Sequence, residues 1–120
     1  MTTEFELRDE RATDAAAIRA LNKLAFRQEL EAEIVDALRS HHAALLSLVA
    51  YLDDRIVGHI LYSSASIDDR IHGAALGPMA VHPEYQHRGI GSRLVEAGNR
   101  KMRGVTGLAR YRPEFSQVIE

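Results

Sequence analysis

Residues 86–92 have the composition of a loop that binds phosphate. Gly89 and Gly91 leave the backbone free of bulky side chains at the point where a helix is expected to begin. N–H groups at the start of a helix attract anions, because the helix dipole is positive there. Arg88 and Arg93 add positive charge that favours a diphosphate over a carboxylate. The alternative is that the glycines only permit a tight turn, and the Gly-x-Gly pattern alone leaves both interpretations open.

Two other phosphate-binding motifs fit this loop poorly. The dinucleotide fingerprint requires a third glycine, and that position is Leu94. The P-loop requires Gly-Lys followed by Ser or Thr, and this tripeptide does not occur in the sequence. The sequence therefore supports neither nucleotide-binding fold.

Hydrophobic periodicity predicts the elements that precede the loop. Polar and apolar residues alternate around Phe5 and Leu7, as in a half-buried strand, and Thr13 and Asp14 are suited to cap a helix. Acidic residues near the start of a second helix interact favourably with the positive end of its dipole. They are expected to form a solvated helix face; the alternative is a surface that attracts a cationic amine. The predicted elements are a strand around 5–7, helices ending at 26 and spanning 28–39, and a hairpin of strands at 45–52 and 55–66.

The segment that leads into the glycine loop is predicted to be a buried, irregular strand at 74–81. After a polar loop at 68–72 this run is almost uncharged, and Gly77–Pro78 within it predicts a bulge, since proline donates no hydrogen bond to a sheet. His82–Pro83 ends the strand. A helix is expected from about 89 to 103, so the order is strand, loop, glycines, helix.

With these elements in place, the sequence resembles the GNAT superfamily of N-acetyltransferases. The family's acyl-coenzyme A motif is Gln/Arg-x-x-Gly-x-Gly/Ala after a strand that ends in Val-x-Pro. Here it is matched by Val81, Pro83, Gln86, Gly89 and Gly91. The order of the other elements is also similar over residues 4–103. The resemblance implies one domain over residues 1–120 with an α/β (α+β) fold. Its mixed, mostly antiparallel central sheet would be flanked by helices and would lack the last strands of the family.

The resemblance implies acetyl-CoA as the co-substrate and places it on two segments. The strand would hold the pantetheine arm and the thioester carbonyl through the backbone of Met79, Ala80 and Val81. The pyrophosphate would lie on the loop and the first helical turn. The residues concerned there are Gln86, His87, Arg88, Gly89, Ile90, Gly91 and Ser92.

The implied activity is transfer of an acetyl group to a primary amine of a small molecule or a protein. Similar enzymes often use a tyrosine to protonate the departing thiolate, and the candidate here is Tyr111. The alternative is that Tyr111 only packs its ring. Glu84 is a candidate base, although a loop carboxylate near a helix start is more often solvated. The histidines have no metal-ligand spacing, so no metal is assigned.

The sequence departs from the family after about residue 104. Gly107, Tyr111, Pro113 and Phe115 look like an altered copy of a segment found in part of the superfamily, and the last hairpin has no counterpart. An unpaired sheet edge can be covered by a second subunit, so a homodimer is expected. The departure also keeps two alternatives open: a non-catalytic, regulatory CoA-binding module, and a relic that lacks its natural remainder.

Composition limits the other functions that the chain could have. The net charge of -2 gives no field to hold a nucleic acid, so any phosphate site must be local. The sequence has no cysteine, which excludes disulfides and thiolate nucleophiles. No apolar run is long enough to cross a membrane, and the cytoplasm is the expected location.

Overall fold

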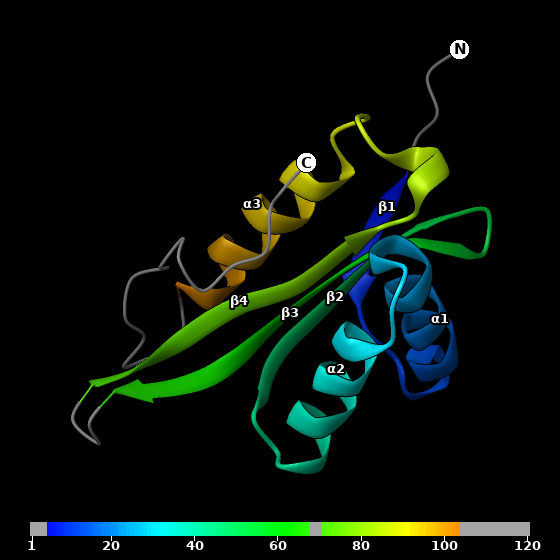
Figure 1. The fold of residues 1–120 in the computed structure, drawn as a ribbon. Helices are drawn as coiled ribbons and strands as arrows, with labels where there is room; N and C mark the ends of the chain where they lie inside the picture. Colours follow the sequence, from blue (N-terminus) through cyan, green and yellow to red (C-terminus); the bar gives the residue numbers. More distant parts are fainter. Residues whose placement is uncertain (1–4, 68–70, 104–120) are drawn as a thin grey trace.

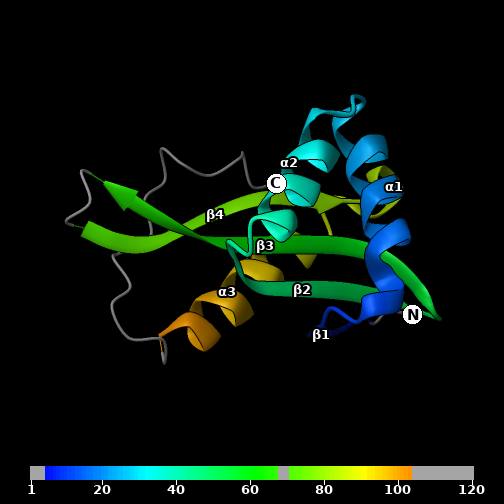
Figure 2. The ribbon, with the colours of Figure 1, turned by 90° about the horizontal axis from the view of Figure 1, so that it is seen from below.

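The computed structural model describes residues 5–67 and 71–103. Within them, four antiparallel strands form one sheet in the order β1-β2-β3-β4, with helices on both of its faces (Figures 1 and 2). This arrangement confirms the predicted fold class of an antiparallel sheet flanked by helices. The elements are β1 (Glu6–Asp9), α1 (Ala15–Phe26), α2 (Leu30–Ser40), β2 (Ala44–Leu52), β3 (Arg55–Ile67), β4 (Ile71–Val81) and α3 (Ile90–Met102), with short 3-10 turns η1 (Ala12–Asp14) and η2 (Pro83–Tyr85).

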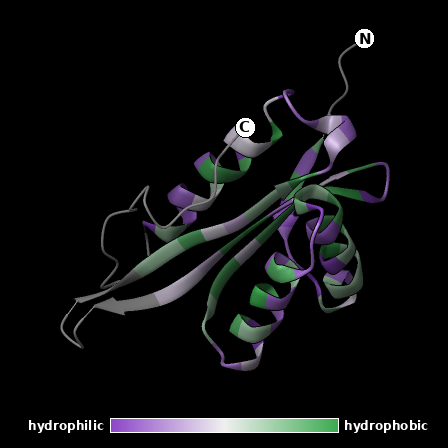
Figure 3. Cartoon of the chain, in the orientation of Figure 1, coloured by the Kyte–Doolittle hydropathy of each residue, from purple (hydrophilic) through white to green (hydrophobic). Residues whose placement is uncertain are grey.

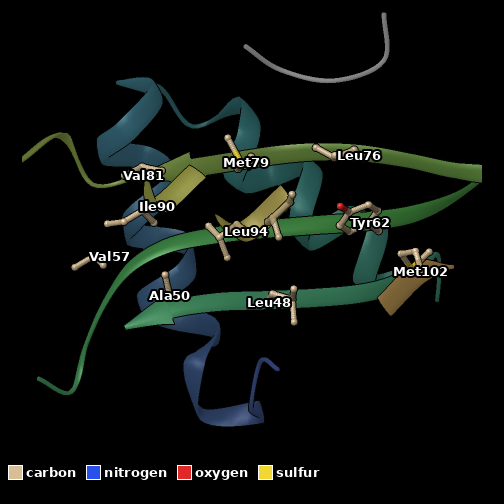
Figure 4. Packing of buried hydrophobic residues seen from close by; sticks show 11 residues of the cluster. Leu48, Ala50, Val57, Tyr62, Leu76, Met79, Val81, Ile90, Leu94 and Met102 are labelled. Atoms are coloured by element: carbon tan, nitrogen blue, oxygen red, sulfur yellow. The ribbon is translucent and has the colours of Figure 1, made fainter. Parts of the chain in front are cut away.

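Helix α3 packs on one face of the sheet, and α1 and α2 lie on the other (Figures 1 and 2). Side chains alternate between the two faces along each strand, so apolar residues are needed on both. Figure 4 shows the cluster on the α3 face, where strand residues meet Ile90, Leu94 and Met102 of that helix. The labelled members are Leu48, Ala50, Val57, Tyr62, Leu76, Met79, Val81, Ile90, Leu94 and Met102, all of which are buried.

Two glycines set the distance between α3 and the sheet. A Cβ atom on Gly58 of β3 would lie 2.8 Å from Ile90 Cγ2. A Cβ atom on Gly98 of α3 would lie 2.7 Å from Cζ of the buried Tyr62 ring. Neither distance is tolerated between real carbon atoms, so glycine at both positions permits the close approach of helix and sheet.

The bulge predicted at Gly77–Pro78 is present in β4. Ile60 of β3 pairs with Met79 and Tyr62 pairs with Leu76, so β4 has one more residue than β3 over this stretch. The Gly77–Pro78 peptide bond is cis, and Gly77 has φ 133. As predicted, β4 ends at Val81, before His82–Pro83.

Two details differ from the sequence prediction. Strand β4 begins at Ile71, within the segment expected to be a loop, because the hairpin continues through the pairs Ser66 with His72 and Ile67 with Ile71. The N-cap of α1 is Asp14, but its side chain does not cap the helix. Its carboxylate instead accepts hydrogen bonds from Arg8 Nη1 at 2.7 Å, from Arg8 Nη2 at 3.1 Å and from the N–H of Arg11 at 2.7 Å.

Candidate functional site

Two hydrogen bonds hold the part of the β4–α3 loop that follows the strand. Gln86 Nε2 donates a hydrogen bond to the carbonyl oxygen of Val81 at 3.1 Å, which ties the loop to the end of the strand. The N–H of Glu84 donates to His82 Nδ1 at 3.1 Å, which shapes the turn at η2. The backbone then passes through two left-handed residues, His87 with φ 65 and Gly89 with φ 85. Glycine is the natural residue at such an angle, whereas a histidine tolerates it less readily.

Helix α3 begins immediately after Gly89, and the first N–H groups of the helix point toward its N-terminal end. Gly89 has no side chain to accept their hydrogen bonds. No atom lies within 4 Å of the position that a Cβ atom of Gly89 would occupy, so the space beside this turn is open. Residues 87–89 and 92–93 are exposed, while Ile90 and Gly91 are buried against the sheet. The turn therefore offers several free donors and the positive end of a 13-residue helix to an anion.

The second predicted segment, Met79–Val81, lies on β4 at one end of the described strand order. The N–H of His82 donates to the carbonyl oxygen of Val57 at 2.8 Å, so it faces β3. Because N–H groups alternate along a strand, the N–H of Ala80 also faces β3, while those of Met79 and Val81 face the outer edge. Met79 and Val81 are thus the members of this trio whose backbone can donate to a molecule lying along that edge.

The candidate catalytic residues are not brought together by the described structure. Glu84 is an exposed residue of η2, in the first part of the loop and before the glycine turn. Tyr111 lies outside the described residues, as do Gly107, Pro113 and Phe115. The acidic residues of α2 do not form one open face either: Glu31 is buried and accepts from Gln28 Nε2 at 3.0 Å, and Glu29 pairs with Lys23 at 3.6 Å.

Sequence reasoning missed a cationic cluster beside the loop. The Arg88 guanidinium carbon lies 5.3 Å from the centre of the Tyr85 ring, and that of Arg55 lies 5.9 Å from the same ring. His82 packs edge-on against Tyr85 with 5.4 Å between ring centres. Arg55 belongs to the start of β3, some 30 positions before Tyr85 in the sequence, so no local pattern could have joined the two. Figure 3 shows that the β2–β3 turn and the loop before α3 are both hydrophilic.

Sequence reasoning also missed a polar network on the face that carries α1 and α2. His59 is fully buried, and its Nε2 lies 2.9 Å from Ser47 Oγ, which donates to Glu10 Oε1. Arg39 Nη2 donates to the same carboxylate at 2.7 Å. Burial first, and Arg39 second, lower the pKa of His59 to about 3, so the ring is neutral near pH 7.

An open cavity of about 320 Å³ lies at the exposed end of this network. Its lining contains both polar and apolar residues, and none of them belongs to the loop between β4 and α3. The lining residues are Asp9, Glu10, Arg39, Ala44, Leu45, Leu46, Ser47 and Leu61.

Neither a metal-binding cluster nor a membrane-spanning helix is found in the part of the chain that the structure describes. Among residues 5–67 and 71–103, no three His, Cys, Asp or Glu side chains are grouped so that they could hold a metal ion. None of the described helices is both long enough and apolar enough to cross a bilayer.

Comparison with known proteins gives a consistent result. Residues 11–112 match the model of the Acetyltransferase (GNAT) family. The chain is 36% identical over 96 residues to YjhQ, an uncharacterised N-acetyltransferase of Escherichia coli K12; the match covers 76% of this chain and 53% of YjhQ. The chain thus spans about half the length of this curated relative.

Solved structures agree with the family match. A GNAT family acetyltransferase from Brucella melitensis, in complex with acetyl-CoA, superposes with a TM-score of 0.82 at 40% identity, covering 88% of this chain and 73% of that one. YhbS from Escherichia coli, in complex with CoA, gives a TM-score of 0.83 at 26% identity, covering 88% of this chain and 60% of that one. The family match covers far more than half of the sequence, and the chain therefore belongs to the GNAT acetyltransferase family.

Proposed function

We propose that this protein is an N-acetyltransferase that moves an acetyl group from acetyl-CoA to a primary amine of a small molecule or a protein. The observation that carries the proposal is the glycine turn at the start of α3, with free N–H donors, open space at Gly89 and the outer edge of β4 leading into it. Family membership and the similar structures from Brucella melitensis and Escherichia coli, bound to acetyl-CoA and CoA, support it.

In this proposal the two segments hold different parts of acetyl-CoA. The pyrophosphate lies on the amides of residues 87–92, where the helix dipole and the donors stabilise its charge. The thioester carbonyl lies along the outer edge of β4, and the N–H of Met79 or Val81 polarises it. A donor aimed at this oxygen is worth most in the transition state, when the oxygen carries negative charge.

The chemistry is a direct transfer without a covalent enzyme intermediate. The neutral amine nitrogen attacks the thioester carbon and forms the C–N bond, the C–S bond breaks, and CoA leaves as a thiolate. A base takes the proton from the amine, and an acid protonates the thiolate. We propose Glu84 and Tyr111 as the candidates for base and acid, to be tested as Glu84→Gln and Tyr111→Phe by comparing kcat.

We also propose a homodimer. In the described residues β4 and β1 are the outer strands of the sheet, and an outer strand has N–H and C=O groups ready to pair with another chain. Size-exclusion chromatography with light scattering tests this directly. A single species of monomer mass at micromolar concentration would rule the homodimer out.

Calorimetric titration with acetyl-CoA tests the function, using the parent protein and Gly89→Glu. The glutamate would extend into the open space at Gly89 and repel the pyrophosphate, so we expect binding to be lost. Because φ 85 strains any residue that has a side chain, circular dichroism first shows that the variant is folded. A doubly substituted Gly89→Glu/Gly91→Glu protein extends the test, although Gly91 is buried and this variant requires a check of folding by circular dichroism. Ala20→Glu/Ala37→Glu, at exposed helix positions, is the control matched in charge to the double variant and should bind as the parent does.

The outcomes separate the possible functions. Binding by the parent that is lost in Gly89→Glu, with acetyl-CoA consumed in the presence of an amine panel, supports the acetyltransferase. Binding without turnover on any amine favours a regulatory CoA-binding module. No binding by a folded parent protein overturns the proposal.

A further inference from the structure

The cationic cluster of Arg55, His82, Tyr85 and Arg88 is assembled from two separate parts of the chain. Arg55 comes from the start of β3, whereas the other three come from η2 and the loop that follows β4. Both guanidinium groups lie over the Tyr85 ring, at 5.9 and 5.3 Å from its centre. Arg55 Nη2 also lies 3.3 Å from His82 Nε2. In Figure 1 the β2–β3 turn and η2 lie at the same end of the sheet, beside the loop that leads into α3.

The two arginines of the cluster have no carboxylate partner among the described residues. Arg8, Arg19, Arg39 and Arg100 each form an ion pair with an acidic residue, but Arg55 and Arg88 do not. Asp53, Asp54 and Glu84 are near them in sequence, yet none forms an ion pair with either arginine. Two positive charges gathered at one ring repel each other, and an anion bound beside them would relieve that repulsion.

The shape of the cluster suits a phosphate group. A guanidinium presents a planar set of donors that matches phosphate oxygens, and stacking on an aromatic ring fixes its orientation before the ligand arrives. A phosphate monoester carries a charge near −2 at neutral pH, which two arginines can balance. The amides of the first turn of α3, at residues 90–92, are a distinct set of donors that follow Gly89 in the chain. The arginine cluster and the amides of the first turn of α3 thus offer separate donors for two phosphate groups.

We propose that Arg55 and Arg88, stacked on Tyr85, bind the 3′-phosphate on the ribose of coenzyme A, separately from the pyrophosphate. The inference rests on the proposed function, because it assigns a second anionic part of the same ligand. It gives this chain a means of discriminating coenzyme A from its 3′-dephospho form. His82 positions Arg55 through the contact between their side chains and does not itself have to touch the ligand.

The test compares the affinity of acetyl-CoA with that of 3′-dephospho-acetyl-CoA by calorimetry at fixed ionic strength. We expect the parent protein to bind acetyl-CoA at least about tenfold more tightly, as charged hydrogen bonds to one phosphate allow. In Arg55→Gln and in Arg88→Gln this ratio should fall toward one. Using the ratio cancels any effect of the lost charge on the pyrophosphate, which both ligands share.

Three further variants sharpen the test. Arg100→Gln removes the same charge from an exposed position on α3 and should leave the ratio unchanged. Tyr85→Phe keeps the ring and should also keep the ratio, whereas Tyr85→Leu removes the platform and should lower it although both arginines remain. Thermal unfolding of each variant shows whether it is folded.

The results distinguish this inference from the proposed function. Equal affinities for the two ligands in the parent protein would overturn the inference and leave acetyl-CoA binding intact. An equal loss of affinity for both ligands in Arg55→Gln and Arg88→Gln would also overturn it, because the arginines would then act on a shared part of the ligand. If neither ligand binds to the folded parent protein, the proposed function itself is wrong.

Discussion

Gln86 Nε2 donates a hydrogen bond to the carbonyl oxygen of Val81 across a five-residue separation, at 3.1 Å. Val81 is the last residue of β4, and Gln86 precedes the left-handed turn that starts α3. One side chain therefore fixes the glycine turn relative to the outer edge of β4. In the proposed function these two places hold the two ends of a single ligand, so their relative position matters for its affinity.

We predict that Gln86→Leu weakens acetyl-CoA binding by about fivefold, since a hydrogen bond of this kind contributes about 1 kcal/mol. Without this hydrogen bond the loop would sample other conformations, and the free energy needed to order it would weaken binding. The melting temperature should change little, because the loop lies outside the core. Calorimetry measures the affinity, and Gln28→Leu, at an exposed residue between α1 and α2, is the matched control. Unchanged affinity in Gln86→Leu would show that the tie has no role in binding.

The sequence predicted the parts of the structure that depend on local rules. Gly77–Pro78 indicated the bulge, His82–Pro83 indicated the end of the strand, and the residues after them indicated the turn into a helix. Each of these features follows from the backbone limits of glycine or proline. Their placement along the chain therefore needed no knowledge of tertiary contacts.

The features that the sequence could not predict depend on contacts between distant segments. Arg55 meets Tyr85 only because β3 pairs with β4, and a charged residue after a turn gives no sign of such a contact. His59 falls within the strand predicted at 55–66, and only the structure shows that it is fully buried and bonded to Ser47 on the neighbouring strand. The start of β4 was placed too late because its pairing with β3 overrides the low strand propensity of polar residues.

A second prediction concerns the contact of Gly98 with the Tyr62 ring. Alanine normally stabilises a helix relative to glycine by about 1 kcal/mol. Here Gly98→Ala should instead lower the free energy of unfolding by about 1–3 kcal/mol, because its Cβ would overlap a buried ring in a packed core. Urea unfolding measures the change. In a Tyr62→Leu background the overlap is relieved, so the same substitution should be neutral or stabilising; destabilisation of equal size there would refute the steric explanation.

A third prediction concerns the ion pair between Arg8 and Asp14. The Asp14 carboxylate accepts three hydrogen bonds, from both Arg8 nitrogens and from the N–H of Arg11, and the Arg8 bond is the main reason that its pKa is lowered. We expect Asp14→Asn to reduce the free energy of unfolding by about 1–3 kcal/mol, since a partly buried guanidinium would lose its charged partner. Asp36→Asn breaks an exposed pair with Arg19 and should cost less than about 1 kcal/mol. Similar effects in chemical denaturation of the two variants would contradict this ranking.

The last prediction concerns His59 and the dependence of stability on pH. Burial lowers the pKa of His59 from 6.5 to about 3 in the folded protein, whereas an unfolded chain keeps a value near 6.5. The unfolded state therefore binds more protons between these two values, and acid favours unfolding. The contribution of neutral His59 is complete above pH 6.5 and is lost as the pH falls toward 3. Linkage gives a loss of about 2 kcal/mol between pH 7 and pH 5 from this group alone.

The variant His59→Gln tests this, because a glutamine amide can still donate to Ser47 but does not titrate. Its free energy of unfolding should be lower than that of the parent at pH 7 and should fall less steeply from pH 7 to pH 5. His42→Asn, at an exposed left-handed position that asparagine tolerates, should retain the slope of the parent. Equal slopes in the parent and in His59→Gln, measured by denaturant unfolding at each pH, would mean that His59 takes up its proton in the folded protein as it does in the unfolded chain. The assignment of a neutral, buried His59 would then be wrong.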